Sequence, residues 1–189
     1  MKIYKNLFDK IIAPENLFAA WDKFKLGKGN KCDVQRFEWS LEQNVFALHW
    51  GLKNQIYKHA PYTSFYIFDP KRRHIHKAIV RDRVLHHALF RVVNPIFEET
   101  FINNSFSCRK NKGTHAGVNA LENMLRKASK NFKKPCYALK CDIAKFFDSV
   151  NHEALKGIIA KRIKDKDTLL LCGEIIDSYR MREREGERE

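Results

Sequence analysis

The chain has 189 residues, with 36 Lys and Arg against 22 Asp and Glu, so its formal net charge is +14. This length fits one domain, or one domain and part of a second. The basic excess indicates a polyanionic partner, nucleic acid or a membrane surface. No apolar run approaches the ~20 residues that cross a bilayer, and the N-terminus lacks the apolar core of a signal peptide.

The five cysteines lie far apart and form no C-x-x-C pair, which argues against disulfides and against a zinc site. They are Cys32, Cys108, Cys136, Cys141 and Cys172. We therefore expect reduced thiols in a cytoplasmic protein.

The first sixty residues read as mostly helical. Pro14-Glu15-Asn16 predicts a helix start, residues 25–31 predict a basic loop, and a longer helix is expected over about 33–57. Residues 63–78 combine aromatic and β-branched side chains with an Asp69-Pro70 turn, which predicts a hairpin whose returning strand is basic.

Helices are predicted after the hairpin. Asp82 is placed to begin one, Thr114 to cap the next, and Asn151 or Ser149 to cap a third, with a last helix over about 167–179. The helix after Thr114 is expected to bury Val118, Leu121, Leu125 and Ala128. Residues 181–189 form a charged tail that we expect to be disordered.

Residues 137–152, YALKCDIAKFFDSVNH, combine a short strand pattern with an acid at its end. Apolar residues alternate with Lys140 and Asp142, and an aromatic pair follows. A carboxylate at a strand end suits Mg²⁺ and phosphoryl transfer. By spacing alone, an acid that closes a strand and caps a turn is the commoner case.

The rest of the chain favours the first interpretation. Residues 137–152 resemble the first catalytic motif of reverse transcriptases, especially those of group II introns and diversity-generating retroelements. Four upstream blocks resemble the fingers of that family in the family's order, so the similarity covers roughly residues 5–180. These blocks are IFDPKRRHI (67–75), RDRVLHHAL (81–89), NPIFE (94–98) and FINNSFSCRKNKGTHA (101–116).

The resemblance implies an α+β fold, a right-hand polymerase fingers/palm fragment that is mostly helical, with a β-hairpin and the first palm strand. We expect an N-terminal helical fingers region at 1–60, the fingers hairpin and helices at 61–135, and the beginning of the palm at 136–180. The family's aromatic-x-Asp-Asp hairpin has no counterpart, because the chain contains no Asp-Asp pair. We therefore expect a chain truncated before the second catalytic motif and inactive alone.

By resemblance, Asp142 is the first carboxylate of a two-metal site that uses Mg²⁺, with Mn²⁺ as a substitute, and the carbonyl of Ile143 is a neighbouring ligand. Phe147 would stack beneath the nucleotide sugar and select deoxynucleotides, which sends Phe146 to the core. Asp148 is expected to orient the following loop or cap a helix more often than to add charge near the metals.

The resemblance also assigns basic residues. Arg73 and Lys71 would grip the triphosphate and Arg72 would contact nucleic acid, although a solvated charge run is the alternative. In the loop before the helix at Thr114, we expect Arg109 to bind nucleotide or template phosphate, and Lys110 and Lys112 to contact nucleic acid. Arg81 and Arg83 flank Asp82, and internal pairing of this trio is also open.

The implied function is RNA-directed DNA synthesis in a bacterial retroelement, with template RNA, a primer and dNTPs as partners. The short N-terminus favours the diversity-generating class, with group II introns close behind. One alternative is a non-catalytic RNA-binding relic. Another is a structural or interaction protein, which the +14 charge disfavours. His74-x-His76 and His86-His87 lack a third zinc ligand at a suitable spacing.

Overall fold

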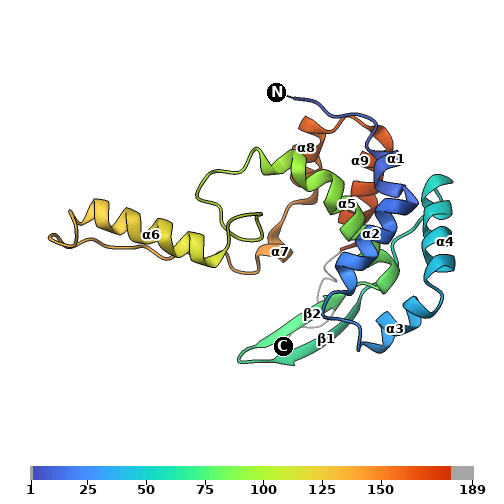
Figure 1. Cartoon of the computed structure of the whole chain (residues 1–189), viewed down its shortest axis with the longest axis horizontal. Helices are drawn as coiled ribbons and strands as arrows, with labels where there is room; N and C mark the ends of the chain where they lie inside the picture. Colours follow the sequence, from blue (N-terminus) through green and yellow to red (C-terminus); the bar gives the residue numbers. More distant parts are fainter. Residues whose placement is uncertain (1, 180–189) are drawn as a thin grey trace, which may run out of the picture. The chain divides into compact units, whose positions relative to one another are not determined.

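The computed structural model describes residues 2–179, which form helices and a single two-stranded hairpin that follows the fourth helix (Figure 1). The elements in chain order are α1 (Phe8–Ile12), α2 (Pro14–Lys25), α3 (Cys32–Trp39), α4 (Leu41–Lys53), β1 (Thr63–Phe68), β2 (Arg72–Lys77), α5 (Val80–Glu98), α6 (Thr114–Ala128), α7 (Phe146–Ser149), α8 (His152–Arg162) and α9 (Lys166–Ser178). The described part of the chain divides into two compact units, unit 1 (residues 2–93 and 148–179) and unit 2 (Asn94–Phe147).

The core of unit 1 is built around α2, which begins at Pro14 as predicted. Its apolar residues recur at helical spacing and are buried together: Leu17, Ala20, Trp21 and Phe24. Trp21 stacks on Phe37 of α3 with ring centroids 5.2 Å apart. Val45 and Leu48 of α4 and Val84, Leu85 and Ala88 of α5 complete the core.

The helix predicted over 33–57 is two helices, because Ser40 leaves the helical conformation (φ −124°, ψ 45°). A serine competes for nearby backbone hydrogen bonds and weakens a helix interior. The break is stabilised by Asn44, whose Nδ2 donates to the carbonyl of Phe37 at 2.9 Å and satisfies an acceptor at the end of α3.

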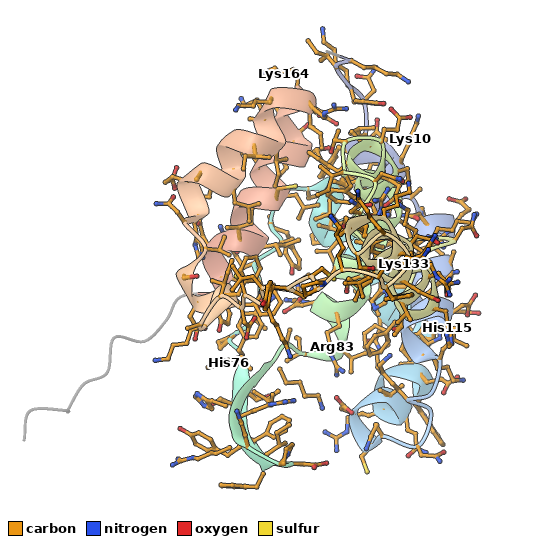
Figure 2. All side chains as sticks on the ribbon, turned by 90° about the vertical axis from the view of Figure 1, so that its left-hand side faces the viewer. Lys10, His76, Arg83, His115, Lys133 and Lys164 are labelled. Atoms are coloured by element: carbon orange, nitrogen blue, oxygen red, sulfur yellow. The ribbon has the colours of Figure 1, made fainter. Side chains whose placement is uncertain are left out.

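The predicted hairpin is confirmed. β1 and β2 pair antiparallel, with Tyr66 opposite His74 and Phe68 opposite Arg72, and the turn contains Asp69-Pro70. In both views the hairpin extends away from the helices of unit 1 (Figures 1 and 2), and Figure 2 shows side chains on both sides of its ribbon. Most of its residues are exposed.

Asp82 lies in the first turn of α5 and is completely buried. Its carboxylate accepts hydrogen bonds from the Tyr57 hydroxyl (3.0 Å), the Ala60 backbone N–H (2.8 Å) and the Arg81 Nε (2.7 Å). Asp82 therefore ties the segment before the hairpin to the helix after it. Burial, together with the Asp82 charge, raises the pKa of Tyr57 well above its usual value.

A pair of imidazoles lies beside Asp82. The rings of His59 and His86 are stacked, and their Nε2 atoms are 3.2 Å apart. His59 Nδ1 lies 2.6 Å from the carbonyl oxygen of Ala60, so this nitrogen carries a hydrogen. In a neutral pair, His86 Nε2 therefore donates to His59. Burial, and secondarily His59, lowers the pKa of His86 to about 4.

The C-terminal helices of unit 1 largely follow the sequence. Asn151 caps α8, because its Oδ1 accepts from the backbone N–H of Ala154 at 2.9 Å, and α9 occupies the expected range. Asp165 accepts hydrogen bonds from the backbone of Leu7 and Phe8, which holds the N-terminal segment against the start of α9. The predicted charged tail at 181–189 lies outside the described residues.

Unit 2 differs from the prediction. Gly113 (φ 106°), not Thr114, precedes the first turn of α6, and the expected inward face of that helix is not buried. No strand forms over 137–143, where Tyr137 is 96% and Leu139 91% exposed. A strand needs a partner for its hydrogen bonds, and within residues 2–179 the hairpin is the only sheet. Phe146 is half exposed and lies outside the core.

Replacing Asp82 with Ala should lower the free energy of unfolding by about 3–5 kcal/mol, because a guanidinium, a hydroxyl and a backbone N–H lose their buried acceptor. Urea unfolding followed by circular dichroism measures this loss. The matched control is Asp22→Ala, since Asp22 is exposed on α2 and its loss should stay within about 0.5 kcal/mol. Equal effects of both substitutions would contradict the role of Asp82.

Acid should destabilise the fold through His86. Because its folded pKa lies below the ordinary value of 6.5, only the unfolded chain gains this proton between pH 6.5 and about 4. The contribution of neutral His86 to the free energy of unfolding is therefore complete above pH 6.5. It is lost as the pH is lowered across this window, by on the order of 3 kcal/mol. Urea unfolding from pH 7 to 4 should show a flatter profile for His86→Gln than for the parent. Parallel profiles would contradict this.

Candidate nucleic-acid interface

The tip of the hairpin carries three adjacent cations, Lys71, Arg72 and Arg73, and all are exposed. Across residues 2–179, none of the three makes a hydrogen bond or ion pair with another side chain or with the backbone. Within residues 2–179, one of the three side chains makes a cation–π contact: the Arg72 guanidinium lies over the Tyr66 ring, 4.1 Å from its centroid. These charges are therefore available to a phosphate.

The strand register separates the cations by face. Tyr66 pairs with His74 and Phe68 with Arg72, so these four side chains share one face of the hairpin. Arg73 pairs with Ile67 on the opposite face. The sequence pattern predicted phosphate-binding roles for Lys71, Arg72 and Arg73, but it did not predict a role for Tyr66 or Phe68, and His74 and His76 were considered only as zinc ligands. The alternation of rings and cations in both strands is the signal that could have found them.

The cations that follow the hairpin are paired within unit 1. Arg81 binds Asp82 and also donates to the carbonyl of Lys58 at 2.7 Å. Arg83 and Lys77 both bind Asp33, at 2.6 and 2.7 Å. Burial would raise the pKa of Asp33, but the hydrogen bonds from Lys77 and Arg83 outweigh it and lower that pKa. Within the trio that the sequence left open, Arg81 pairs with Asp82, whereas Arg83 pairs with Asp33 outside the trio.

A cavity of about 1000 Å³ lies beside these ion pairs, between α3, α4 and the base of the hairpin. Phe37, Trp50 and Tyr57 contribute to its lining. Arg36 stands at this cavity without an ion-pair partner among residues 2–179, whereas Lys77 and Arg81 are paired there. The cavity therefore offers fewer available charges than the hairpin tip.

The basic loop of unit 2 uses its charges internally. Arg109 donates to Glu98 Oε1 at 2.7 Å and to the carbonyls of Ile102 (2.9 Å) and Ser105 (3.1 Å), and its side chain is largely buried. Lys112 binds Asn103. Lys110 is exposed. The hydrogen bonds of Arg109 and Lys112 hold the loop together. Lys110 is the cation of this loop that is accessible to a ligand.

The residues expected at the metal site lie in the irregular end of unit 2. Asp142 and Ile143 are exposed, and Phe147 is 79% exposed with its ring against Phe146 at 5.4 Å. Residues 2–179 contain no cluster of three or more His, Cys, Asp or Glu side chains that could hold a metal ion. Asp142 as placed is thus a single carboxylate, which does not fit a complete two-metal site.

Asp148, in unit 1, has a structural partner. Its Oδ1 accepts a hydrogen bond from the Tyr179 hydroxyl at 2.8 Å. Burial and this neighbouring carboxylate raise the pKa of Tyr179 to about 12. The contact joins Asp148 to the end of α9, so the expectation that Asp148 orients the following loop or caps a helix stays a prediction.

Comparison with known proteins gives a distant relation. No protein-family model matches the chain. It is 24% identical over 97 residues to Protein YkfC of Escherichia coli (strain K12), covering 51% of this chain and 25% of that protein. It is 26% identical over 91 residues to Nuclear intron maturase 1, mitochondrial, of Arabidopsis thaliana, covering 48% of this chain and 12% of that protein.

The chain therefore spans a small part of the length of these relatives, and about half of it is distantly similar to an intron maturase. Among the helices within residues 2–179, none combines the length and the apolar character that crossing a lipid bilayer requires.

Proposed function

We propose that this chain supplies the fingers and the first catalytic motif of an RNA-directed DNA polymerase of the group II intron and diversity-generating retroelement type. The observation that carries the proposal is the exposed hairpin tip, where the Lys71, Arg72 and Arg73 side chains have no hydrogen-bond or ion-pair partner on the described chain. The +14 net charge and the distant similarity to an intron maturase support it.

The chemistry of the tip suits phosphate. Arg73 presents a planar fork of donors that matches two phosphate oxygens, and Lys71 adds a point charge beside it. Because these groups have no internal partner, a phosphate does not have to displace an existing ion pair. In this proposal the tip contacts the incoming dNTP and the RNA template, while Lys110 supplies a further contact in unit 2.

Catalysis needs more than the described residues provide. Asp142 and the carbonyl of Ile143 would contribute to a Mg²⁺ or Mn²⁺ site only together with carboxylates from outside this set, so no chemical step is assigned to this chain alone.

Phe147 is proposed to select deoxynucleotides. Comparing dNTP and rNTP incorporation for Phe147→Ala in an active protein that contains this chain tests that role, because unchanged sugar preference would exclude it.

A non-catalytic RNA-binding protein is the second candidate. The single, exposed carboxylate of Asp142 and the irregular backbone at 135–143 favour it. Both candidates require RNA binding by the hairpin, and they differ in whether Asp142 matters for nucleotide incorporation.

Charge removal at the hairpin tip should lower the affinity for RNA and make that affinity less dependent on salt concentration. The combined variant Lys71→Gln, Arg72→Gln and Arg73→Gln removes three available charges. Because each neutralised phosphate of a single strand contributes about 0.7 to the slope of log affinity against log salt, the slope should fall by roughly 2. Fluorescence anisotropy with single-stranded RNA at several salt concentrations measures it.

The matched control removes three exposed charges from α1, α2 and the preceding segment, through Lys5→Gln, Lys10→Gln and Lys23→Gln. Both variants lower the net charge by the same amount, so a difference between them reports position. A salt slope that falls equally in both would contradict a binding site at the hairpin. Binding that does not depend on salt would contradict the proposed function itself.

Asp142→Asn should abolish nucleotide incorporation in an active protein that contains this chain, with either Mg²⁺ or Mn²⁺, because the substitution keeps the shape and removes the charge. RNA affinity should stay the same. The assay is primer extension, with Asp148→Asn as the control acid six residues away. Normal incorporation by Asp142→Asn would favour the RNA-binding candidate.

A further inference from the structure

One face of the hairpin carries a continuous row of planar side chains. The Arg72 guanidinium lies 4.1 Å from the centroid of the Tyr66 ring. The Tyr66 ring is stacked on His74 with ring centroids 4.5 Å apart, and the centroids of His74 and His76 are 4.4 Å apart. The row continues from His76 to Tyr179, at 5.5 Å. It then reaches Tyr62 at 5.8 Å and His59 at 4.9 Å. All of these residues belong to unit 1.

The strand register explains why the row exists. Residues two apart on a strand share a face, so Arg72, His74 and His76 of β2 align with their partners Phe68, Tyr66 and Ser64 of β1. Arg73 falls on the other face, opposite Ile67. The two arginines therefore serve different surfaces although they are adjacent in the sequence.

The row is accessible at the hairpin and buried at its base. Phe68 is 73% and Tyr66 48% exposed, and Arg72, His74 and His76 are exposed as well, whereas the side chain of His59 is completely buried. Figure 2 shows His76 on the hairpin, near its junction with the rest of unit 1. The buried end anchors the row, and the exposed end leaves aromatic surface in water.

The guanidinium of Arg72 adds a phosphate-binding group to the exposed aromatic end of the row. Its Cζ lies over the Tyr66 ring, and none of its donors is used by another of residues 2–179. These donors are therefore available to a phosphate. Rings that stack on bases, next to a cation that binds the backbone, are the combination by which proteins hold single-stranded nucleic acid.

We propose that this face, formed by Tyr66, Phe68, Arg72, His74 and His76, binds an unpaired stretch of nucleic acid by base stacking. It is a second surface, distinct from the Arg73 face of the same hairpin. A duplex does not satisfy it, because bases stacked within a helix do not offer their faces to Tyr66 and Phe68. The proposal rests on the proposed function, since it concerns how the same hairpin holds RNA.

The test compares two strands of equal length and charge, a 12-nucleotide single-stranded RNA and an abasic strand with the same backbone. Fluorescence anisotropy at one fixed salt concentration gives both affinities for the full 189-residue chain. The parent should bind the strand with bases about 10-fold more tightly, as expected when one or two bases stack on aromatic rings.

Two variants locate the effect. The double substitution Tyr66→Leu and Phe68→Leu removes the rings from this face and should abolish the preference for bases while binding to the abasic strand persists. Phe65→Leu removes a ring from the opposite face and should leave the preference intact. Arg72→Lys, which keeps the charge, should lower the affinity for both strands by a similar factor and leave the preference for bases intact, because Arg72 binds the backbone that the two strands share.

The outcomes separate this inference from the proposed function. Equal affinity of the parent for the two strands, or an equal loss with Phe65→Leu, would overturn base stacking on this face and leave RNA binding in place. Failure of the parent to bind either strand would overturn both proposals, because the row would then have no role in binding nucleic acid.

Discussion

The carboxylate of Asp82 is removed from water and holds three donors from two segments, the Tyr57 hydroxyl and the Ala60 N–H before the hairpin and Arg81 after it. An isolated two-stranded hairpin is marginally stable in water. Here both of its ends are fixed to one buried acceptor, so the hairpin keeps its position on the helices although most of its own residues are exposed. The tip and the planar row depend on this attachment.

The structure separates cations that hold the fold from cations that are available to a ligand. Arg81, Arg83 and Arg109 are engaged with carboxylates and carbonyls, at distances of 2.6–2.7 Å for their ion pairs. Arg72 and Arg73 have no such partner within residues 2–179. Net charge alone therefore overstates the binding surface, and the hairpin tip presents two adjacent arginines that have no competing acceptor within residues 2–179.

Local signals in the sequence predicted the parts of the fold that local interactions decide. Pro14 begins α2, Asn151 caps α8, and the hairpin forms around Asp69-Pro70. The division at Ser40 was not predicted, because its stabilising contact between Asn44 and Phe37 lies across the break. The buried role of Asp82 was also missed, since it depends on residues more than twenty positions away.

Periodicity in unit 2 predicted buried faces that the structure leaves exposed, at α6 and at 137–143. A period of 3.6 or 2 identifies the apolar side of an element, but not whether another element covers it. The candidate site shows the same limit. The residue types at Arg109 and Arg73 are identical, and only the distribution of acceptors such as Glu98 distinguishes the engaged group from the available one.

If RNA contacts this chain at the hairpin, as proposed, photocrosslinking should locate the contact there. A single-stranded RNA that carries 4-thiouridine would be bound at low salt, irradiated and digested, and the crosslinked peptides identified by mass spectrometry. Crosslinks should be concentrated in residues 63–77, with Tyr66 and Phe68 prominent. Crosslinks that fall mainly on α1, α2 or α8, with none in the hairpin, would contradict this proposal.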